Sequence, residues 1–150
     1  MADYVPRDPD FERRVRESFA RQRAMETFGA RLLRVAPGEV EVGVDFEEAF
    51  TQQHGYLHAG LVTAIVDTAC GYAALTLTEP GAEVLSVEFK LNLLAPAAGR
   101  GFVARARVVR AGRNLTVCAG DFYALEDGGE KLVATMLGTM MKVAGERSRQ

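Results

Sequence analysis

The sequence contains no tryptophan and only two cysteines, Cys70 and Cys118. Two cysteines are too few for a disulfide framework or a four-cysteine zinc site, and they fit a reducing compartment. The net charge is only −2 at pH 7, so the chain lacks the overall basic field that binds nucleic acid or anionic membranes. We therefore predict a cytoplasmic protein that has neither nucleic acid nor a membrane as its partner.

The sequence also lacks the features of a signal peptide or a membrane span. Its first residues include acids and two prolines, where a signal peptide has a basic start and an apolar run. The longest apolar stretch, residues 58–78, is interrupted by Asp67, which favours a buried helix over a bilayer span. The 150 residues, 48% of them hydrophobic, suit one domain that has a single core.

Hydrophobic periodicity predicts helices and strands along the whole chain. Residues 10–28 show the i, i+4 spacing of a helix, which Asp8 or Asp10 could cap and Gly29 would end. Runs that alternate between apolar and polar residues predict strands at 31–36, 39–46, 85–93, 102–110, 115–125 and 131–143. In the third of these runs, the leucines and other apolar residues from Leu85 to Leu93 are expected on one face, with Ser86 on the other.

The segment 57–77 is apolar around almost its whole circumference, which predicts a helix that is covered on nearly all sides. One curved antiparallel sheet wrapped around this helix satisfies the order of elements, and the fold class is therefore α+β. We expect residues 1–29 to form an N-terminal helical extension, residues 30–144 to form the domain, and residues 145–150 to form a disordered tail.

Two features of the central helix could carry chemistry. Asp67 is the single charged residue between His58 and Thr78, and a carboxylate in such apolar surroundings is costly unless it faces a cleft or a partner. It could act as a general base or as a nucleophile. The start of the helix offers backbone N–H groups for an oxyanion, and the small residues Ala59 and Gly60 would let a substrate approach them.

The spacing between these two features has a consequence for assembly. Ala59 and Asp67 are eight residues apart, about 12 Å along a helix axis. One carbonyl group cannot contact both within one chain, so a site that uses both requires a second copy of the protein. His54 and His58 are four residues apart, but two histidines alone do not complete a metal site, and we expect no metal and no cofactor.

At this point the residues show a family resemblance. Gln52, His58-Ala59-Gly60 and Asp67 at their spacing, together with the segments 85–99 and 109–114, resemble the hotdog-fold acyl-CoA thioesterases. The phenylacetate-pathway (PaaI-type) branch and the 4-hydroxybenzoyl-CoA thioesterases are the most similar groups. The resemblance covers residues 31–143 and implies the hotdog fold, with a long central helix inside the sheet and the N-terminal helix as an addition.

The resemblance also implies a hydrolytic mechanism and roles for individual residues. Asp67 stands where the family places the acid that attacks the thioester or activates water. Gln52 matches an amide that holds substrate or water, with Gln53 as a second choice. Ala59 stands where a glycine N–H polarises the thioester carbonyl, and His58 matches the histidine that supports this loop. Here alanine replaces glycine, which keeps the N–H but adds a methyl group.

Further residues are implied as contacts for substrate and CoA. Ser86 lies near the position of a hydroxyl that orients water, and Lys90 and Asn92 lie where the pantetheine arm would pass. Arg113 matches a position near the nucleotide end of CoA, and Gly60 belongs to the backbone that the substrate approaches. The resemblance implies a homodimer for the site and a back-to-back homotetramer of two dimers. The N-terminal helix could cover one end of a substrate tunnel.

Two other functions are compatible with the sequence. A hotdog hydratase or dehydratase that acts on an enoyl or hydroxyacyl thioester would pair the carboxylate with a catalytic histidine, His54 or His58. A non-catalytic acyl-CoA sensor would bind its ligand stably and carry a DNA-binding segment, for which the arginine-rich helix at 13–23 is the single candidate.

Overall fold

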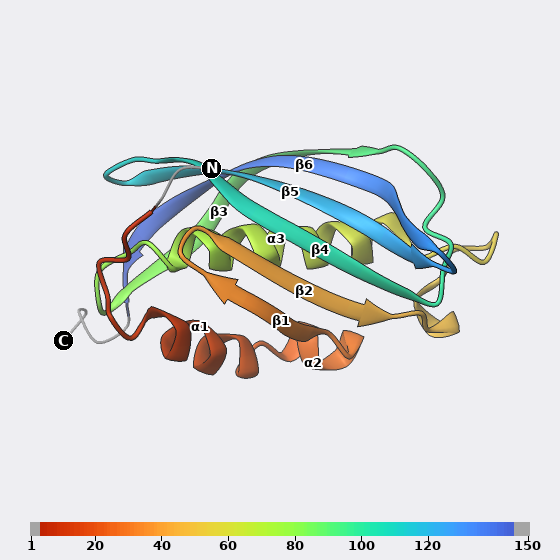
Figure 1. Cartoon of the computed structure of the whole chain (residues 1–150), viewed down its shortest axis with the longest axis horizontal. Helices are drawn as coiled ribbons and strands as arrows, with labels where there is room; N and C mark the ends of the chain where they lie inside the picture. Colours follow the sequence, from red (N-terminus) through yellow and green to blue (C-terminus); the bar gives the residue numbers. More distant parts are fainter. Residues whose placement is uncertain (1–3, 146–150) are drawn as a thin grey trace.

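One antiparallel sheet and one long helix dominate the computed structural model, which describes residues 4–145 (Figure 1). The elements follow one another as α1 (Phe11–Ala20), α2 (Arg23–Phe28), β1 (Arg31–Ala36), β2 (Glu39–Asp45), η1 (Glu48–Phe50), α3 (Ala59–Leu75), β3 (Ala82–Leu93), β4 (Gly101–Ala111), β5 (Leu115–Glu126) and β6 (Gly129–Ala144). All the predicted strands are present. The predicted tail lies outside the described residues, apart from residue 145.

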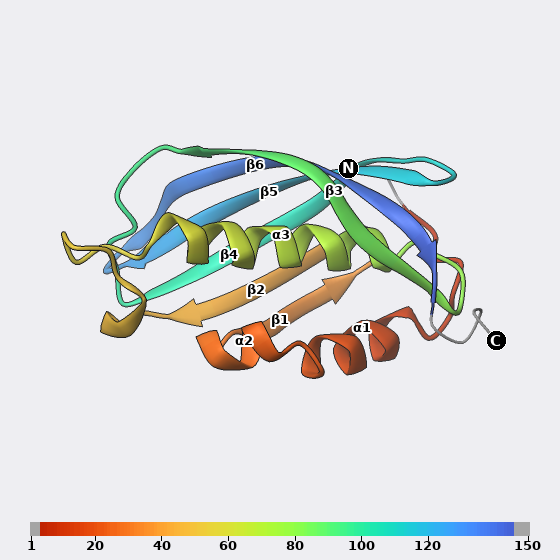
Figure 2. The same ribbon diagram turned by 180° about the vertical axis from the view of Figure 1, so that it is seen from behind.

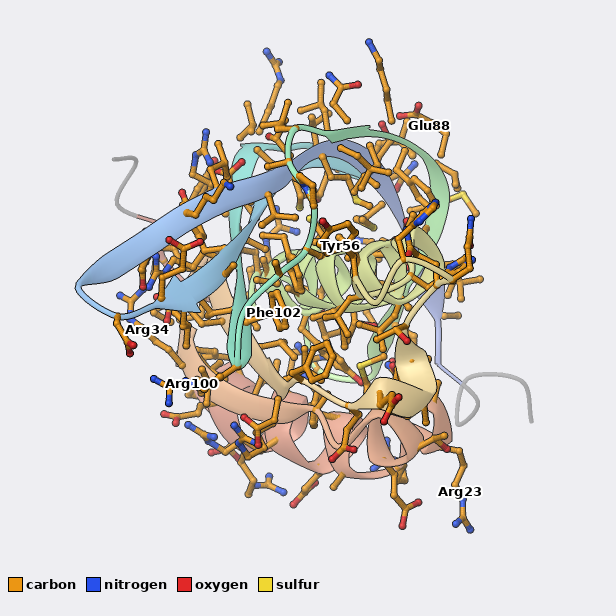
Figure 3. The ribbon with its side chains drawn as sticks, turned by 90° about the vertical axis from the view of Figure 1, so that its right-hand side faces the viewer. Arg23, Arg34, Tyr56, Glu88, Arg100 and Phe102 are labelled. Carbon is orange, nitrogen blue, oxygen red and sulfur yellow. The ribbon has the colours of Figure 1, made fainter. Side chains whose placement is uncertain are left out.

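The six strands form a single sheet in the order β1-β2-β4-β5-β6-β3. Seen along the axis of α3, the sheet curves around the helix, with Phe102 inside and Glu88 pointing away (Figure 3). Strands β1 and β3 are the two edges of the sheet, because each has one neighbour only. This is the hotdog architecture, and the predicted fold is confirmed.

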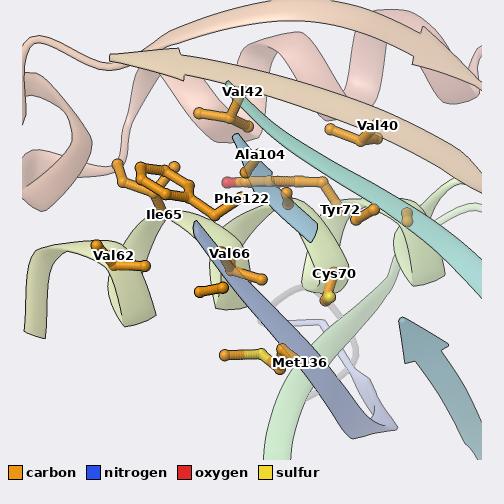
Figure 4. Packing of buried hydrophobic residues seen from close by; sticks show 14 of the residues in the cluster. Val40, Val42, Val62, Ile65, Val66, Cys70, Tyr72, Ala104, Phe122 and Met136 are labelled. Atoms are coloured by element: carbon orange, nitrogen blue, oxygen red, sulfur yellow. The ribbon is translucent and has the colours of Figure 1, made fainter. Parts of the chain in front are cut away.

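The core lies between α3 and the concave face of the sheet (Figure 4). Ile65 and Val66 of α3 are fully buried, and so is Phe122 of β5, whose ring stacks on that of Phe102 at 5.5 Å between centroids. Each side chain of this size stabilises the fold by roughly 1.5–3 kcal/mol when it is buried. The apolar circumference of α3 is therefore explained by the sheet that surrounds it.

The N-terminal segment contains two helices where the sequence predicts one. The helical conformation is interrupted between α1 and α2 at Gln22, whose backbone is extended (φ −81°, ψ 99°). The Gln22 side chain reaches α3, where its Nε2 lies 3.4 Å from the Tyr72 hydroxyl and its Oε1 accepts a hydrogen bond from Thr68 Oγ1 at 3.2 Å. These contacts with α3 favour the break over a continuous helix. Gly29 ends α2 in the left-handed conformation (φ 66°), as predicted.

Helix α1 lies beside β1 and contacts α3, in the gap between the two edges of the sheet (Figure 2). Neither predicted cap forms a standard side-chain cap at its start. Asp8 Oδ1 instead accepts a hydrogen bond from the Asp10 N–H at 2.9 Å, and Asp8 Oδ2 lies 3.0 Å from Arg14 Nε. Arg14 also donates to the carbonyl oxygen of Ala82, the first residue of β3. Helix α1 therefore links both edges of the sheet.

The predicted alternation along β3 is wrong at its start. A bulge at Val87 shifts the register, so that Ser86 pairs with buried Met140 while Glu88 pairs with the next residue of β6, Thr139. An extra residue on one strand reverses the side of the sheet on which the following side chains lie. Ser86 therefore faces the helix, and Leu85 is 57% exposed.

Candidate active site

Asp67 and Ser86 are brought together by α3 and the bulged start of β3. The Ser86 hydroxyl donates a hydrogen bond to Asp67 Oδ1 at 2.7 Å. Both residues line a cavity of about 220 Å³ between α1, α3 and β3. Asp67 is partly buried, and no other residue of α3 carries a charge. The carboxylate therefore combines an oriented oxygen with access to a space that could hold a substrate.

His58 organises the start of α3. Its Nδ1 accepts a hydrogen bond from the Gly60 N–H at 2.8 Å, and its carbonyl oxygen accepts from the N–H groups of Leu61 and Val62. The Ala59 N–H has no acceptor within residues 4–145. The first turn of a helix carries several unpaired N–H groups, and the contacts of His58 leave that of Ala59 free to bind an oxyanion.

The predicted amide of Gln52 shapes the loop before α3. Gln52 Oε1 accepts hydrogen bonds from the backbone N–H groups of His54, at 2.5 Å, and Tyr56, at 3.4 Å. Gln53 is exposed in the same loop. Within one chain, neither amide is among the residues that line the cavity of Asp67.

The observed helix keeps Ala59 and Asp67 apart. Both lie in the uninterrupted helix α3, which separates them by about 12 Å along its axis. The free N–H and the carboxylate of one chain therefore cannot contact the same carbonyl group.

The residues predicted to contact CoA are not gathered at Asp67. Lys90 and Asn92 are exposed on the edge strand β3. Arg113, in the hairpin between β4 and β5, lines a separate small cavity near the C-terminal end of α3, together with Arg7 and Lys142. Glu79 also lines this second cavity and pairs with Lys142 and Arg7. The cavity lies far from the start of α3.

The remaining titratable candidates offer no second reactive centre. Burial raises the pKa of the Cys118 thiol to about 12 and also raises that of Cys70, so neither is a ready thiolate nucleophile. His54 is exposed in the loop, while His58 is engaged by the helix start. In the part of the chain that the structure describes, no three histidine, cysteine or acidic side chains are arranged to hold a metal ion.

The sequence analysis allowed the N-terminal helix to cover one end of a substrate tunnel, but it did not identify the residues of this segment that line the cavity. Ser18 and Gln22 of this segment line the cavity together with Asp67, Ser86 and Tyr72. Their sequence pattern, polar residues on an arginine-rich helix, is that of any solvated surface. The contact could be found only once α1 was placed against α3.

Comparisons with known proteins identify the family. A model of the thioesterase superfamily matches residues 54–131. A solved structure of a thioesterase family protein from Silicibacter pomeroyi is 51% identical, with a TM-score of 0.88 over 90% of this chain and 99% of that one. Human acyl-coenzyme A thioesterase 13 is 35% identical over 104 residues, 69% of this chain and 72% of the human protein. The chain belongs to the thioesterase superfamily.

The fold agrees with this assignment. The E. coli PaaI protein from the phenylacetic acid degradation operon has a TM-score of 0.82 over 91% of this chain and 95% of its own, at 19% identity. At that identity the likeness concerns the fold. Membership of the superfamily makes the protein an enzyme, a thioester hydrolase, and confirms the resemblance stated from the sequence.

The structure favours neither of the two alternative functions. A hydratase would pair the carboxylate with a histidine, but within one chain neither His54 nor His58 lines the cavity of Asp67. A DNA-binding segment would need free cations, but Arg13 of α1 pairs with acidic neighbours on its own helix and Arg14 is largely buried against Asp8. No helix within residues 4–145 has the length and apolar character to cross a membrane.

Proposed function

We propose that this protein hydrolyses an acyl-CoA, or a related acyl thioester, to the free acid and CoA at a site shared by two copies of the chain. One observation carries the proposal: Asp67, hydrogen-bonded to Ser86, faces a cavity, while the Ala59 N–H at the start of the same helix is free. A second copy would supply the Ala59 N–H to the carbonyl that Asp67 approaches.

The reaction needs a base or nucleophile and a donor for the oxyanion. In the first route, Asp67 takes a proton from water as the water attacks the thioester carbonyl, the tetrahedral intermediate expels CoA thiolate, and the thiolate takes up that proton. In the second route, Asp67 itself attacks and expels CoA, and water then cleaves the mixed anhydride. In both routes, the Ala59 N–H stabilises the oxyanion, and the Ser86 hydroxyl orients the carboxylate.

The edge strand β3 is the surface that we expect to join two copies. Its apolar side chains Val87, Phe89 and Leu93 are 48%, 43% and 55% exposed. An edge strand that exposes apolar side chains is a template for pairing with another strand. Antiparallel pairing of two β3 strands about a two-fold axis would cover these side chains and bring the start of one α3 towards Asp67 of the other.

We also propose the coarser assembly and contacts that the resemblance implies. On the outer face of the sheet, Leu115 and Leu137 are 50% and 54% exposed, and back-to-back packing of two dimers into a homotetramer would cover them. Lys90, Asn92 and Arg113 are our candidates for contacts with CoA. A cytoplasmic location is supported by the absence of a disulfide between the two buried cysteines.

A complementation experiment tests the shared site. Ala59→Pro deletes the oxyanion N–H at the first position of the helix, where proline is well tolerated, and the extended His58 (φ −63°, ψ 137°) is compatible with a following proline. Asp67→Asn removes the base or nucleophile. We expect each variant alone to lose about 10²–10³-fold in kcat, measured as thiol release from acyl-CoA.

Mixing and refolding the two variants distinguishes a shared site from a site within one chain. Half of the refolded dimers would be mixed, and each mixed dimer would hold one intact site of two, so about a quarter of the wild-type activity should return. Asp127→Asn, an exposed carboxylate in the turn between β5 and β6, is the control and should keep full activity. Full activity of Asp67→Asn, or no recovery on mixing, would contradict the proposal.

A further inference from the structure

Met140 of β6 contacts Ser86 but does not line the cavity of Asp67. The Met140 Sδ lies 3.3 Å from Ser86 Oγ, and Met140 is only 1% exposed. The cavity is lined by Asp67 and Ser86 without Met140. Within one chain, Met140 therefore has no access to a substrate in this cavity, and any effect that it has on the reaction must pass through Ser86.

The bulge in β3 places this methionine opposite Ser86. The two residues are partners in the antiparallel pairing of β3 with β6, and the next pair after the bulge is Glu88 with Thr139. Directly opposed residues of an antiparallel pair have their side chains on one face, with Cβ atoms about 4.5–5.5 Å apart. The distortion that turns Ser86 towards Asp67 therefore also turns it onto Met140.

A glycine two residues earlier in β6 gives the Met140 side chain its room. Residues two apart in a strand lie on the same face, and a Cβ added at Gly138 would lie 3.2 Å from Met140 Cε, which is tighter than an ordinary van der Waals contact. Because protein interiors are close-packed, a side chain at position 138 would displace the methionine. Close packing thus fixes the position of the thioether beside Ser86.

The Ser86 hydroxyl has one proton and two acceptors within reach. Asp67 Oδ1 lies at 2.7 Å and Met140 Sδ at 3.3 Å. Hydrogen bonds to ionised acceptors are roughly twice as strong as those to neutral acceptors, and a thioether sulfur is a weak acceptor. The proton therefore goes to Asp67, while Met140 occupies the neighbouring space with a group that does not compete for it.

We propose that Met140 is a positioning residue for thioester hydrolysis. It fills the space beside the Ser86 hydroxyl with a weak acceptor, excludes water and stronger acceptors from that space, and so keeps the hydroxyl directed at Asp67. A strong acceptor in that space would take the Ser86 proton, and the Asp67 carboxylate would lose the hydrogen bond that orients it. This inference rests on the proposed acyl thioesterase function and extends it to a residue outside the cavity.

A competing acceptor at position 140 tests the proposal. Met140→Gln keeps an unbranched side chain of similar length but introduces an amide oxygen, a stronger acceptor than a thioether. We expect kcat for thiol release from acyl-CoA to fall about tenfold, as for the loss of one hydrogen bond to a charged group. The KM should change by less than about twofold, because Met140 does not line the cavity. Met140→Leu restores an apolar side chain of similar volume and should recover the kcat that Met140→Gln loses.

Met136→Gln is the matched control. Met136 belongs to the same strand and to the core around α3 (Figure 4) and is 2% exposed, but its partner in β3 is Leu91. Both glutamine variants bury an amide in an apolar core and should lower the melting temperature. Only Met140→Gln should lower kcat, measured per folded protein at a temperature below both transitions.

A double-mutant cycle with Ser86→Ala shows whether Met140 acts through Ser86. Without the hydroxyl there is no proton to compete for, so Met140→Gln should change the kcat of Ser86→Ala by less than about twofold. Gly138→Ala gives a second cycle, and it keeps the test available if Met140→Gln does not fold. Its Cβ would press on Met140 Cε, so it should lower kcat in the wild-type background and leave that of Ser86→Ala unchanged.

The outcomes separate this inference from the function on which it rests. If the wild type is active but Met140→Gln keeps its kcat, or if Met140→Leu or Met136→Gln loses as much, Met140 does not direct the hydroxyl. An equal loss in the Ser86→Ala background has the same meaning. Each of these results overturns the inference and leaves the thioesterase function standing. If the wild type releases thiol from no acyl-CoA, the proposed function and this inference are overturned together.

Discussion

Arg14 joins the N-terminal helix α1 to the C-terminal end of α3. Its replacement tests how much these contacts contribute to the free energy of unfolding. Its terminal guanidinium nitrogens lie within hydrogen-bonding distance of four backbone carbonyl oxygens, those of Leu75, Thr78, Glu79 and Ala82. A cation that binds the last carbonyl groups of a helix also interacts favourably with the helix dipole. Arg14 therefore connects α1 to the last residue of α3 and to the turn that leads into β3.

The magnitude follows from the burial of the pair that Arg14 forms with Asp8. The side chains of Arg14 and Asp8 are only 19% and 8% exposed. Removal of one partner from a buried pair leaves the other charge without compensation and costs about 3–5 kcal/mol. We expect a loss of this size for Arg14→Ala. Arg13→Ala is the matched control, because Arg13 is the next residue along, is 64% exposed and forms surface pairs only, which contribute little.

Thermal unfolding followed by far-ultraviolet circular dichroism measures the effect, since the chain has no tryptophan. For a domain of about 150 residues, 3–5 kcal/mol corresponds to a fall of roughly 10 °C in melting temperature. All variants should be compared at one protein concentration, because the stability of an oligomer depends on concentration. Equal melting temperatures for Arg14→Ala and Arg13→Ala would refute the reasoning, since the buried arginine would then contribute no more than a surface charge.

Three further predictions concern the core, the thiols and the acid branch of stability. Gly120→Ala should cost about 1–3 kcal/mol in urea unfolding, because its Cβ would lie 2.8 Å from Cys70 Sγ; an unchanged midpoint would contradict this packing. Ellman's reagent should label Cys70 and Cys118 only after denaturation, since burial raises the pKa of Cys118 to about 12, and rapid labelling of the native protein would be inconsistent with that burial. The hydrogen bond from Lys142 holds the pKa of Glu79 below its ordinary value of 4.5, so its contribution is present above that value and is lost as the pH falls through the lower, folded-state value. Glu79→Gln should therefore be less stable at neutral pH and lose less stability on acidification, and identical acid profiles for the two proteins would argue against the pair.

Much of the fold could be predicted because the signals are local. Strands are predicted where apolar and polar residues alternate along the chain. The valines at 40, 42 and 44 of β2 are all buried, as that pattern predicts. The helix α3 was evident from its apolar circumference and from the turn that follows it. Asp67 stood out for the same reason, since a charge within such a helix needs a partner or a cavity.

Two predictions, the alternation along β3 and the single N-terminal helix, were wrong because they used only local sequence patterns. The bulge at Val87 adds one residue to β3 without a sequence signal, and it turns Ser86 towards Asp67. The break at Gln22 interrupts a segment that has good helical periodicity, because contacts with Tyr72 and Thr68 on α3 favour the extended backbone there. In both places a tertiary contact overrides the local preference.

The sequence by itself determined the six strands, the buried helix, its one carboxylate and the small residues at its start, because these depend on the spacing of polar and apolar residues along the chain. Only the tertiary structure decided that Ser86 meets Asp67, that the Ala59 N–H is the free donor of the first turn, and that Ser18 of α1 lines the cavity of Asp67. Those facts depend on distances between segments that are far apart in the chain, and periodicity carries no information about such distances.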